Sequence, residues 1–359
     1  MSAGPNPRRA WLTGVIRFLP TLLLGIAGGG LAYVAGLPLP WLLGALIAST
    51  LVSLSGTRLR SPGRARRVVL VVIGVMLGTA FSPDMTGDVT AWGTSLIVML
   101  AATALMMAFS MWFGRRVAGY SVSTALYAGV PGGVSAVTLM AVESNADLRI
   151  VGLTHAVRIL VLLVAIPPVL SLLGHVTLQS QTVGWAHWLA VPGPGDSLML
   201  AFAGLAGVWL GRWLRLPNPL LFGPVLVSAA LHVSGMTEAG IPPMIVALAQ
   251  VIIGLSVGVR FGGTPLREVG HGLMMAVVQA VALLAIAVGA AWGIHAATGI
   301  SAAAALLAYM PGGAPELSLA ALSLGIDPAF VTSHHLLRLS VLVLLLPWLL
   351  RGMSRLAQR

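Results

Sequence analysis

Long runs of apolar residues, separated by short polar gaps, dominate the chain. Ten of these runs approach the roughly 20 residues that a helix needs to cross the hydrocarbon core of a bilayer. They cover residues 18–35, 38–54, 68–81, 92–113, 151–173, 198–214, 219–233, 244–261, 273–294 and 331–350. The pattern predicts an all-α polytopic membrane protein, because a spanning helix satisfies its own backbone hydrogen bonds in lipid.

Two further apolar stretches, 121–143 and 301–324, are interrupted near the middle by Pro-Gly-Gly. Proline removes a backbone donor and glycine weakens a helix, so each stretch is expected to break there. Such a break is either a packing kink or a binding site in which free backbone groups face a solute. The residues concerned are Pro131, Gly132, Gly133, Pro311, Gly312 and Gly313.

The two interrupted stretches belong to a longer internal repeat. With an offset of 180, residues 121–167 align on 301–347 without a gap, and 16 of the 47 positions are identical. The Gly74/Gly78 pair matches Gly254/Gly258 at the same offset and is typical of close helix packing. We therefore predict two copies of one unit. Residues 1–173 form repeat one, 174–197 an external linker, and 198–359 repeat two.

Arginine positions indicate how the two copies are oriented. All 20 basic residues are arginine, and 18 of them lie outside the apolar runs or at their ends. If each Pro-Gly-Gly stretch crossed fully, the copies would share one orientation and Arg212 and Arg260 would lie outside. If each stretch returned as a re-entrant hairpin, repeat two would be inverted and all 18 would be cytoplasmic. We predict the second arrangement: ten spans and two hairpins, with both termini inside, in the bacterial inner membrane.

Composition narrows the function. With 58% hydrophobic and 8% charged residues, the chain is far from the roughly 25% charged residues of soluble domains. The net charge of +11 follows membrane topology rather than a nucleic-acid-binding face. The chain has no cysteine, and its eight histidines lack metal-ligand spacing. We therefore expect no metal, no cofactor and no enzyme activity.

Two arginines lie inside apolar helices. Arg158 and Arg338 each follow an aspartate by 11 residues, about 16 Å along a helix. A central arginine costs about 2.5–3.5 kcal/mol on insertion scales, so each needs a partner. The partner is a carboxylate such as Glu316 or Glu143, the carbonyls of the hairpin, or an anionic solute. The sequence leaves these alternatives open.

The neighbouring polar residues have several candidate roles. His155 and His335 lie three residues before the arginines, on the same helix face, and serve either packing or proton relay. Asp147 and Asp327 are expected to be helix N-caps, with ion binding as a second role.

Two more candidates come from the hairpins themselves. Glu316 has Ala136 as its counterpart and is a candidate carrier of a cation or a proton. Ser135 follows the first Pro-Gly-Gly and is included among the binding residues.

The paired hairpins, the Asp/His/Arg helix after each, and the Leu-Pro-x-Pro motif at Leu37 and Leu216 resemble the AbrB-type duplicated membrane protein family. The resemblance covers almost the whole chain. It implies labels such as regulator of gene expression and ammonia monooxygenase, without established site residues. The layout is also similar to elevator-type carboxylate transporters such as the citrate–sodium symporters, by architecture alone.

These observations favour a secondary transporter that moves a small anionic solute by alternating access. Its expected partners are the lipid bilayer, the solute and a coupling ion, Na⁺ or H⁺, with a homo-oligomer left open and no direct nucleic-acid contact. The alternative is a membrane-bound regulator that affects gene expression indirectly. A monooxygenase is disfavoured, since converging metal ligands are missing from the sequence.

Overall fold

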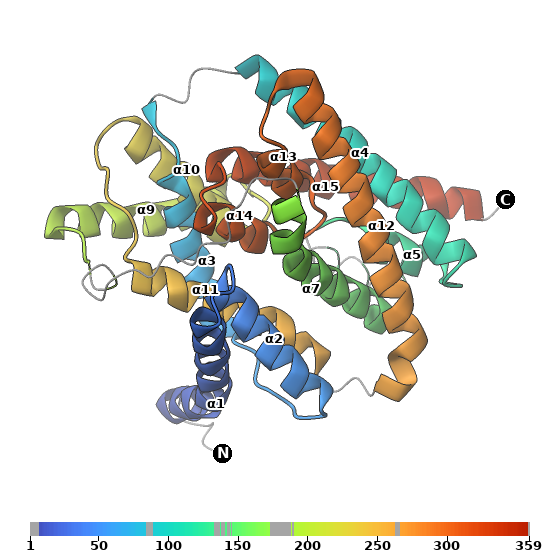
Figure 1. Ribbon diagram of the computed structural model, residues 1–359, viewed down its shortest axis with the longest axis horizontal. Helices are drawn as coiled ribbons and strands as arrows, with labels where there is room; N and C mark the ends of the chain where they lie inside the picture. Colours follow the sequence, from blue (N-terminus) through green and yellow to red (C-terminus); the bar gives the residue numbers. More distant parts are fainter. Residues whose placement is uncertain are drawn as a thin grey trace, which may run out of the picture.

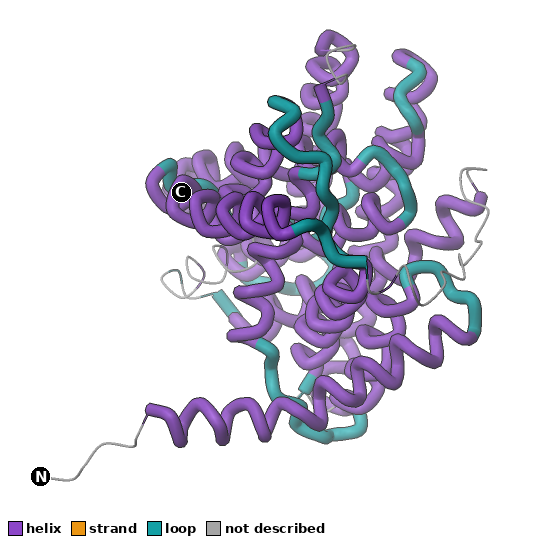
Figure 2. The backbone as a smooth tube through the Cα atoms, turned by 90° about the vertical axis from the view of Figure 1, so that its left-hand side faces the viewer, coloured by secondary structure: helices purple, strands orange, loops and turns teal. Residues whose placement is uncertain are grey.

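The computed structural model describes residues 7–83, 89–132, 137, 141, 144, 146–172, 188, 190–262 and 266–357. Within these ranges the chain forms thirteen α-helices and one 3₁₀ turn, and no strand (Figure 2). The all-α prediction is therefore confirmed for the described part of the chain.

The helices follow the same order in the two halves of the chain. The first half contains α1 (Pro7–Val34), α2 (Pro40–Leu54), α3 (Gly63–Gly78), α4 (Val89–Arg116), α5 (Val122–Gly129) and α7 (Leu148–Leu172). The second contains α9 (Pro194–Trp213), α10 (Pro219–Val233), α11 (Pro243–Gly258) with the 3₁₀ turn η2 (Val259–Phe261), α12 (Leu266–Thr298), α13 (Ala302–Tyr309), α14 (Ala314–Ser323) and α15 (Pro328–Ala357). Helices at matching places have matching lengths: α2 and α10 have 15 residues, α3 and α11 have 16, and α5 and α13 have 8.

Five of the described helices are long and apolar enough to cross a membrane. They contain the segments 92–116, 148–172, 243–261, 270–298 and 328–345. The apolar helices α2 and α10 are shorter, and 15 residues extend only about 22 Å against a core of about 30 Å. The chain is thus a membrane-type helical protein, while the number of ten spans stays a prediction.

Helices from the two halves pack on each other reciprocally. Helix α2 packs on α11, and α10 packs on α3, while α1 and α9 cover the outer sides of α2 and α10. Space at the crossings comes from glycine: a Cβ on Gly74 would meet the Leu221 carbonyl, and one on Gly254 would meet the Leu42 carbonyl. The close packing predicted for the two glycine pairs is therefore present, and the same crossing occurs twice.

The short helices α13 and α14 lie near the middle of the molecule beside α15 (Figure 1), while the short helix α5 packs against α4 and α7. Every residue of α13 is buried. The long helix α12 contacts α7, α13 and α4, while α4 contacts α5. Helices α5 and α13 start on serine caps, since Ser121 Oγ accepts from Thr124 N at 3.2 Å and Ser301 Oγ from Ala304 N at 3.4 Å. These buried short helices bring the candidate residues together.

Candidate binding site at the two broken helices

Both Pro-Gly-Gly stretches break their helices two residues before the proline. Helix α5 ends at Gly129 and α13 at Tyr309, and the residues that precede the prolines leave helical geometry. Val130 has φ −59° and ψ 122°, and Met310 has φ −52° and ψ 133°. Proline restricts the residue before it to such extended angles. In the second half the chain turns and re-enters a helix, α14, directly after Pro311-Gly-Gly.

The two breaks meet. A Cβ on Gly132 would lie 3.5 Å from the carbonyl oxygen of Gly312 and 3.0 Å from Leu339 Cδ2. Gly132 also has φ 109°, a backbone conformation that favours glycine. Segments that are 180 residues apart in sequence thus come close to each other at the two breaks. Gly133 and Ser135 lie outside the described residues.

Arg158 binds the end of the helix that precedes the first break. Its Nη1 donates to the Ala128 carbonyl at 3.3 Å, and its Nη2 donates to the Val130 carbonyl at 2.7 Å. The side chain is 2% exposed. Carbonyls in the last turn of a helix have no partner within that helix and carry partial negative charge. Arg158 therefore caps the C-terminal end of α5.

Arg338 does the same in the second half. Its Nη1 lies 3.4, 3.2 and 2.9 Å from the carbonyls of Ala308, Tyr309 and Met310, and its side chain is 1% exposed. The structure records no ion pair between Arg338 and Glu316, both of which it describes. Of the alternatives left open by the sequence, the geometry therefore matches the backbone carbonyls beside the helix break. Glu143 lies outside the described residues.

The two histidines orient the arginines. Arg158 Nη2 donates to His155 Nδ1 at 2.7 Å, and Arg338 Nη2 donates to His335 Nδ1 at 2.6 Å. Since arginine has no acceptor, each Nδ1 must be unprotonated. His155 then carries its proton on Nε2 and donates it to the Tyr127 carbonyl at 3.0 Å. This geometry suits a neutral positioning histidine better than a proton relay.

The aspartates begin the helices that carry the arginines. Asp147 Oδ1 accepts from the backbone N–H groups of Arg149 at 2.8 Å and Ile150 at 3.2 Å. Asp327 Oδ1 accepts from Phe330 N at 3.0 Å. Both are N-cap hydrogen bonds. Near the first cap, burial and the Asp147 charge raise the pKa of Tyr120.

Glu316 lies at the start of α14, next to the second break. It is 1% exposed, and its Oε2 has no hydrogen-bond partner among the described residues. The carboxylate turns back over Gly313, since a Cβ added to that glycine would collide with it. An acidic group in the first turn is favoured by the helix dipole. Within the described chain, no three His, Cys, Asp or Glu side chains form a metal-type cluster around it.

Arg260 is a charged neighbour of Glu316 that the sequence analysis missed as a site residue. It lies half-buried on η2, and its charge interacts with that of Glu316. In the first half the equivalent positions hold Ala80 and Ala136. This pair of opposite charges therefore exists in one half only. The signal in the sequence that would have revealed this pair is the difference between the two copies at these positions, rather than their similarity elsewhere.

A second polar group outside the predicted site joins α4 to α13 and α15. Ser95 Oγ lies 2.8 Å from Tyr309 Oη and 2.9 Å from His334 Nε2, and Tyr309 Oη donates to the Ser95 carbonyl at 3.0 Å. His334 Nδ1 donates to the Phe330 carbonyl at 2.8 Å. The sequence analysis placed neither Ser95 nor Tyr309 in the candidate site.

Comparison with known proteins gives consistent results over nearly the whole chain. A family model described as "Transition state regulatory protein AbrB" matches residues 41–354. An Escherichia coli (strain K12) protein named "Putative regulator AbrB" is 27% identical over 325 residues, which is 90% of this chain and 92% of the relative. The Bacillus subtilis (strain 168) protein "Uncharacterized protein YhjN" is 25% identical over 348 residues, which is 91% of this chain and 90% of that relative. Because the family model covers well over half of the sequence, this chain belongs to the AbrB family.

Proposed function

We propose that the protein is a secondary transporter that moves a small anionic solute by alternating access. The solute would bind where the Pro131-Gly132 and Pro311-Gly312 turns meet. The observation that carries the proposal is the close approach of Gly132 to Gly312, at two helix breaks from opposite halves of the chain. Discontinuous helices that face each other at a repeat interface are typical of transporter binding sites.

The proposal includes an inverted repeat with two re-entrant hairpins. Along α3 and α10, Gly74 approaches Leu221 and Gly78 approaches Ser228, so these neighbouring helices run parallel. The equivalent contacts of Gly254 and Gly258 make α11 parallel to α2. If α2 and α3 cross the bilayer in succession, they run in opposite directions. Helix α10 then points opposite to its counterpart α2, which supports inversion. The proposal places the protein in a bacterial inner membrane with both termini on the cytoplasmic side.

The charges around the turns favour an anion. Three arginines lie in this part of the molecule: the charges of the buried Arg158 and Arg338 act on each other, and Arg260 interacts with the carboxylate of Glu316. The guanidinium ends of Arg158 and Arg338 bind carbonyls. We therefore infer that the two arginines attract the anion electrostatically rather than through direct bidentate hydrogen bonds. The N-terminus of α14 adds a further partial positive charge. Glu316 would carry the coupling ion, H⁺ or Na⁺.

The family name and the name of the Escherichia coli relative support a second candidate, a membrane-bound regulator. With the same site, such a protein would sense a solute without transporting it and would affect gene expression indirectly. The two candidates differ in net flux, which can be measured.

The test begins with thermal unfolding of the purified protein against a panel of dicarboxylates, tricarboxylates and amino acids, with and without sodium. Each stabilising anion is then offered, radiolabelled, to proteoliposomes that carry an inward pH or sodium gradient. Gradient-driven accumulation is the expected result. Stabilisation without accumulation of any anion would overturn the transporter and favour the regulator.

Two variants test whether transport depends on Glu316 and Arg260, the charge pair present in one half only. Glu316→Ala and Arg260→Ala each introduce the residue that the first half carries at the equivalent position. Glu316→Ala is expected to abolish accumulation that depends on the gradient while retaining anion-induced stabilisation. Glu238→Ala, in an exposed loop, is the matched control and should transport normally.

A further inference from the structure

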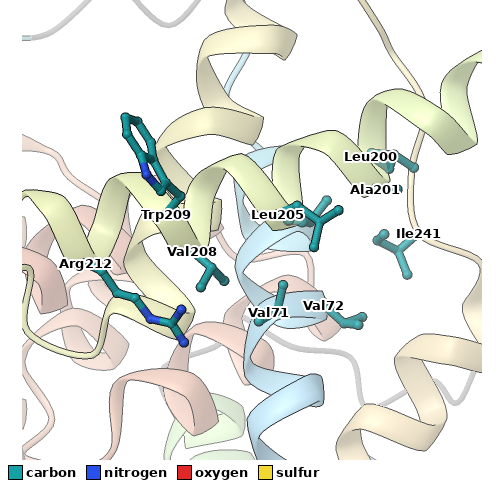
Figure 3. A pocket seen from close by; sticks show the side chains of 11 residues that line it. Val71, Val72, Leu200, Ala201, Leu205, Val208, Trp209, Arg212 and Ile241 are labelled. Carbon is teal, nitrogen blue, oxygen red and sulfur yellow. The ribbon is translucent and has the colours of Figure 1, made fainter.

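A groove of about 650 Å³ lies between α3 and α9, with Ile241 completing its lining (Figure 3). Its walls are apolar along most of its length, with Val71 and Val75 from α3 facing Leu200 and Leu205 from α9. Arg212 is the charged side chain among the lining residues that the structure describes. The groove therefore has a long apolar part and a positively charged end.

The length of the groove corresponds to one leaflet of a bilayer. Leu200 and Arg212 are 12 residues apart on α9, which is about 18 Å along the helix. Half of a hydrocarbon core of about 30 Å is about 15 Å. Gly204 keeps the middle of the groove open, because a Cβ there would approach Val71 Cγ1 to 3.2 Å.

Aromatic residues place the charged end at the membrane surface. Trp209 and Trp213 stack with ring centroids 6.3 Å apart and are 68% and 69% exposed. They flank Arg212 in the last turn of α9. Exposed tryptophans gather at the level of the lipid headgroups. An arginine at that level lies where the phosphate of a phospholipid lies, and its guanidinium matches phosphate geometry.

We propose that this groove binds an anionic phospholipid, with an acyl chain along Val71, Val75 and Leu205 and the headgroup phosphate on Arg212. Charge complementarity favours an anionic lipid over a zwitterionic one. Basic pockets between membrane helices near the cytoplasmic surface bind anionic headgroups for this reason. The proposal requires a membrane location and is independent of transport.

The test uses the full-length protein, purified in detergent and delipidated. Phosphatidylglycerol and phosphatidylcholine with identical acyl chains are added separately, and bound lipid is counted by native mass spectrometry alongside thermal unfolding. We expect at least tenfold more phosphatidylglycerol than phosphatidylcholine to remain bound. Arg212→Gln should reduce phosphatidylglycerol to the level of phosphatidylcholine, while Arg215→Gln, on a nearby exposed arginine outside the lining, should not.

A second variant tests the apolar part. Gly204→Leu should fill the groove and reduce binding of both lipids. Equal retention of both lipids by the unmodified protein, or an unchanged preference in Arg212→Gln, would overturn the proposal. Stabilisation by inorganic phosphate alone would also overturn it. A detergent-stable dimer that Gly204→Leu dissociates would instead assign the groove to a second copy of the chain.

Discussion

Replacing Arg338 with glutamine is expected to destabilise the protein strongly. The glutamine side chain is shorter, so it can replace at most one of the bonds that Arg338 makes with the carbonyls of Ala308, Tyr309 and Met310. At least two of the buried carbonyls would then lose the hydrogen bond from the guanidinium without a replacement. At about 1.5–3 kcal/mol for each hydrogen bond to a charged group, the free energy of unfolding should fall by about 3–6 kcal/mol. Such a loss is a large share of the roughly 5–15 kcal/mol that stabilises a typical protein.

The measurement is unfolding of the purified protein in mixed detergent–SDS micelles, with expression level as a second readout. Arg158→Gln should cost somewhat less, because Arg158 binds two carbonyls rather than three. Arg338→Lys keeps the charge but loses the planar fork, so an intermediate loss is expected. Arg215→Gln, at an exposed position, is the control and should change stability little.

Two results would refute this reasoning. If Arg338→Gln unfolds like the unmodified protein but no longer responds to anions, the arginine is a solute ligand and the carbonyl bonds are incidental. If Arg338→Gln is destabilised and Glu316→Gln restores it, the two side chains form an ion pair. The structure predicts no rescue, because it records no such pair.

Three further predictions concern packing, the polar group and topology. Gly254→Ala should lower the free energy of unfolding by about 1–3 kcal/mol, because the added methyl group overpacks against the Leu42 carbonyl. Gly289→Ala, in open space on α12, should raise it by about 0.5–1 kcal/mol. Equal effects of the two changes in an unfolding assay would contradict the close helix crossing at Gly254. Tyr309→Phe should lower the free energy of unfolding by about 0.5–1.5 kcal/mol through the lost hydrogen bonds to Ser95. An unchanged stability would show that these hydrogen bonds do not stabilise the protein. In intact cells an impermeant thiol reagent should label Ser234→Cys but not Ala65→Cys, and the opposite pattern would overturn the proposed topology.

Hydrophobic runs and the repeat predicted the helices well, because burial and helix breaking depend on local composition. The breaks at Pro131 and Pro311 follow directly from what proline excludes. The hydrogen-bond partners of Arg158 and Arg338 could not be predicted. Every residue carries a backbone carbonyl, and no side-chain pattern indicates which carbonyl accepts the hydrogen bond from an arginine.

Residues without a counterpart in the other half were the harder part. Comparing the copies selects what they share and therefore passes over Ser95, Tyr309 and Arg260, whose equivalents are Met275, Gly129 and Ala80. Their roles depend on tertiary contacts between segments far apart in sequence, such as the 214 residues between Ser95 and Tyr309.

The arginine bonds also determine which parts of the molecule can move separately. Arg338 belongs to α15, the second helix after the Pro311 break, yet it donates hydrogen bonds to carbonyls at the end of α13, before the break. Bending at the Pro311 turn would break these bonds, so we expect α13 and α15 to move together. The same holds for α5 and α7 through Arg158. If the proposed transport takes place, we therefore expect its hinges to lie in the connections outside these units and the helix breaks to keep a constant shape.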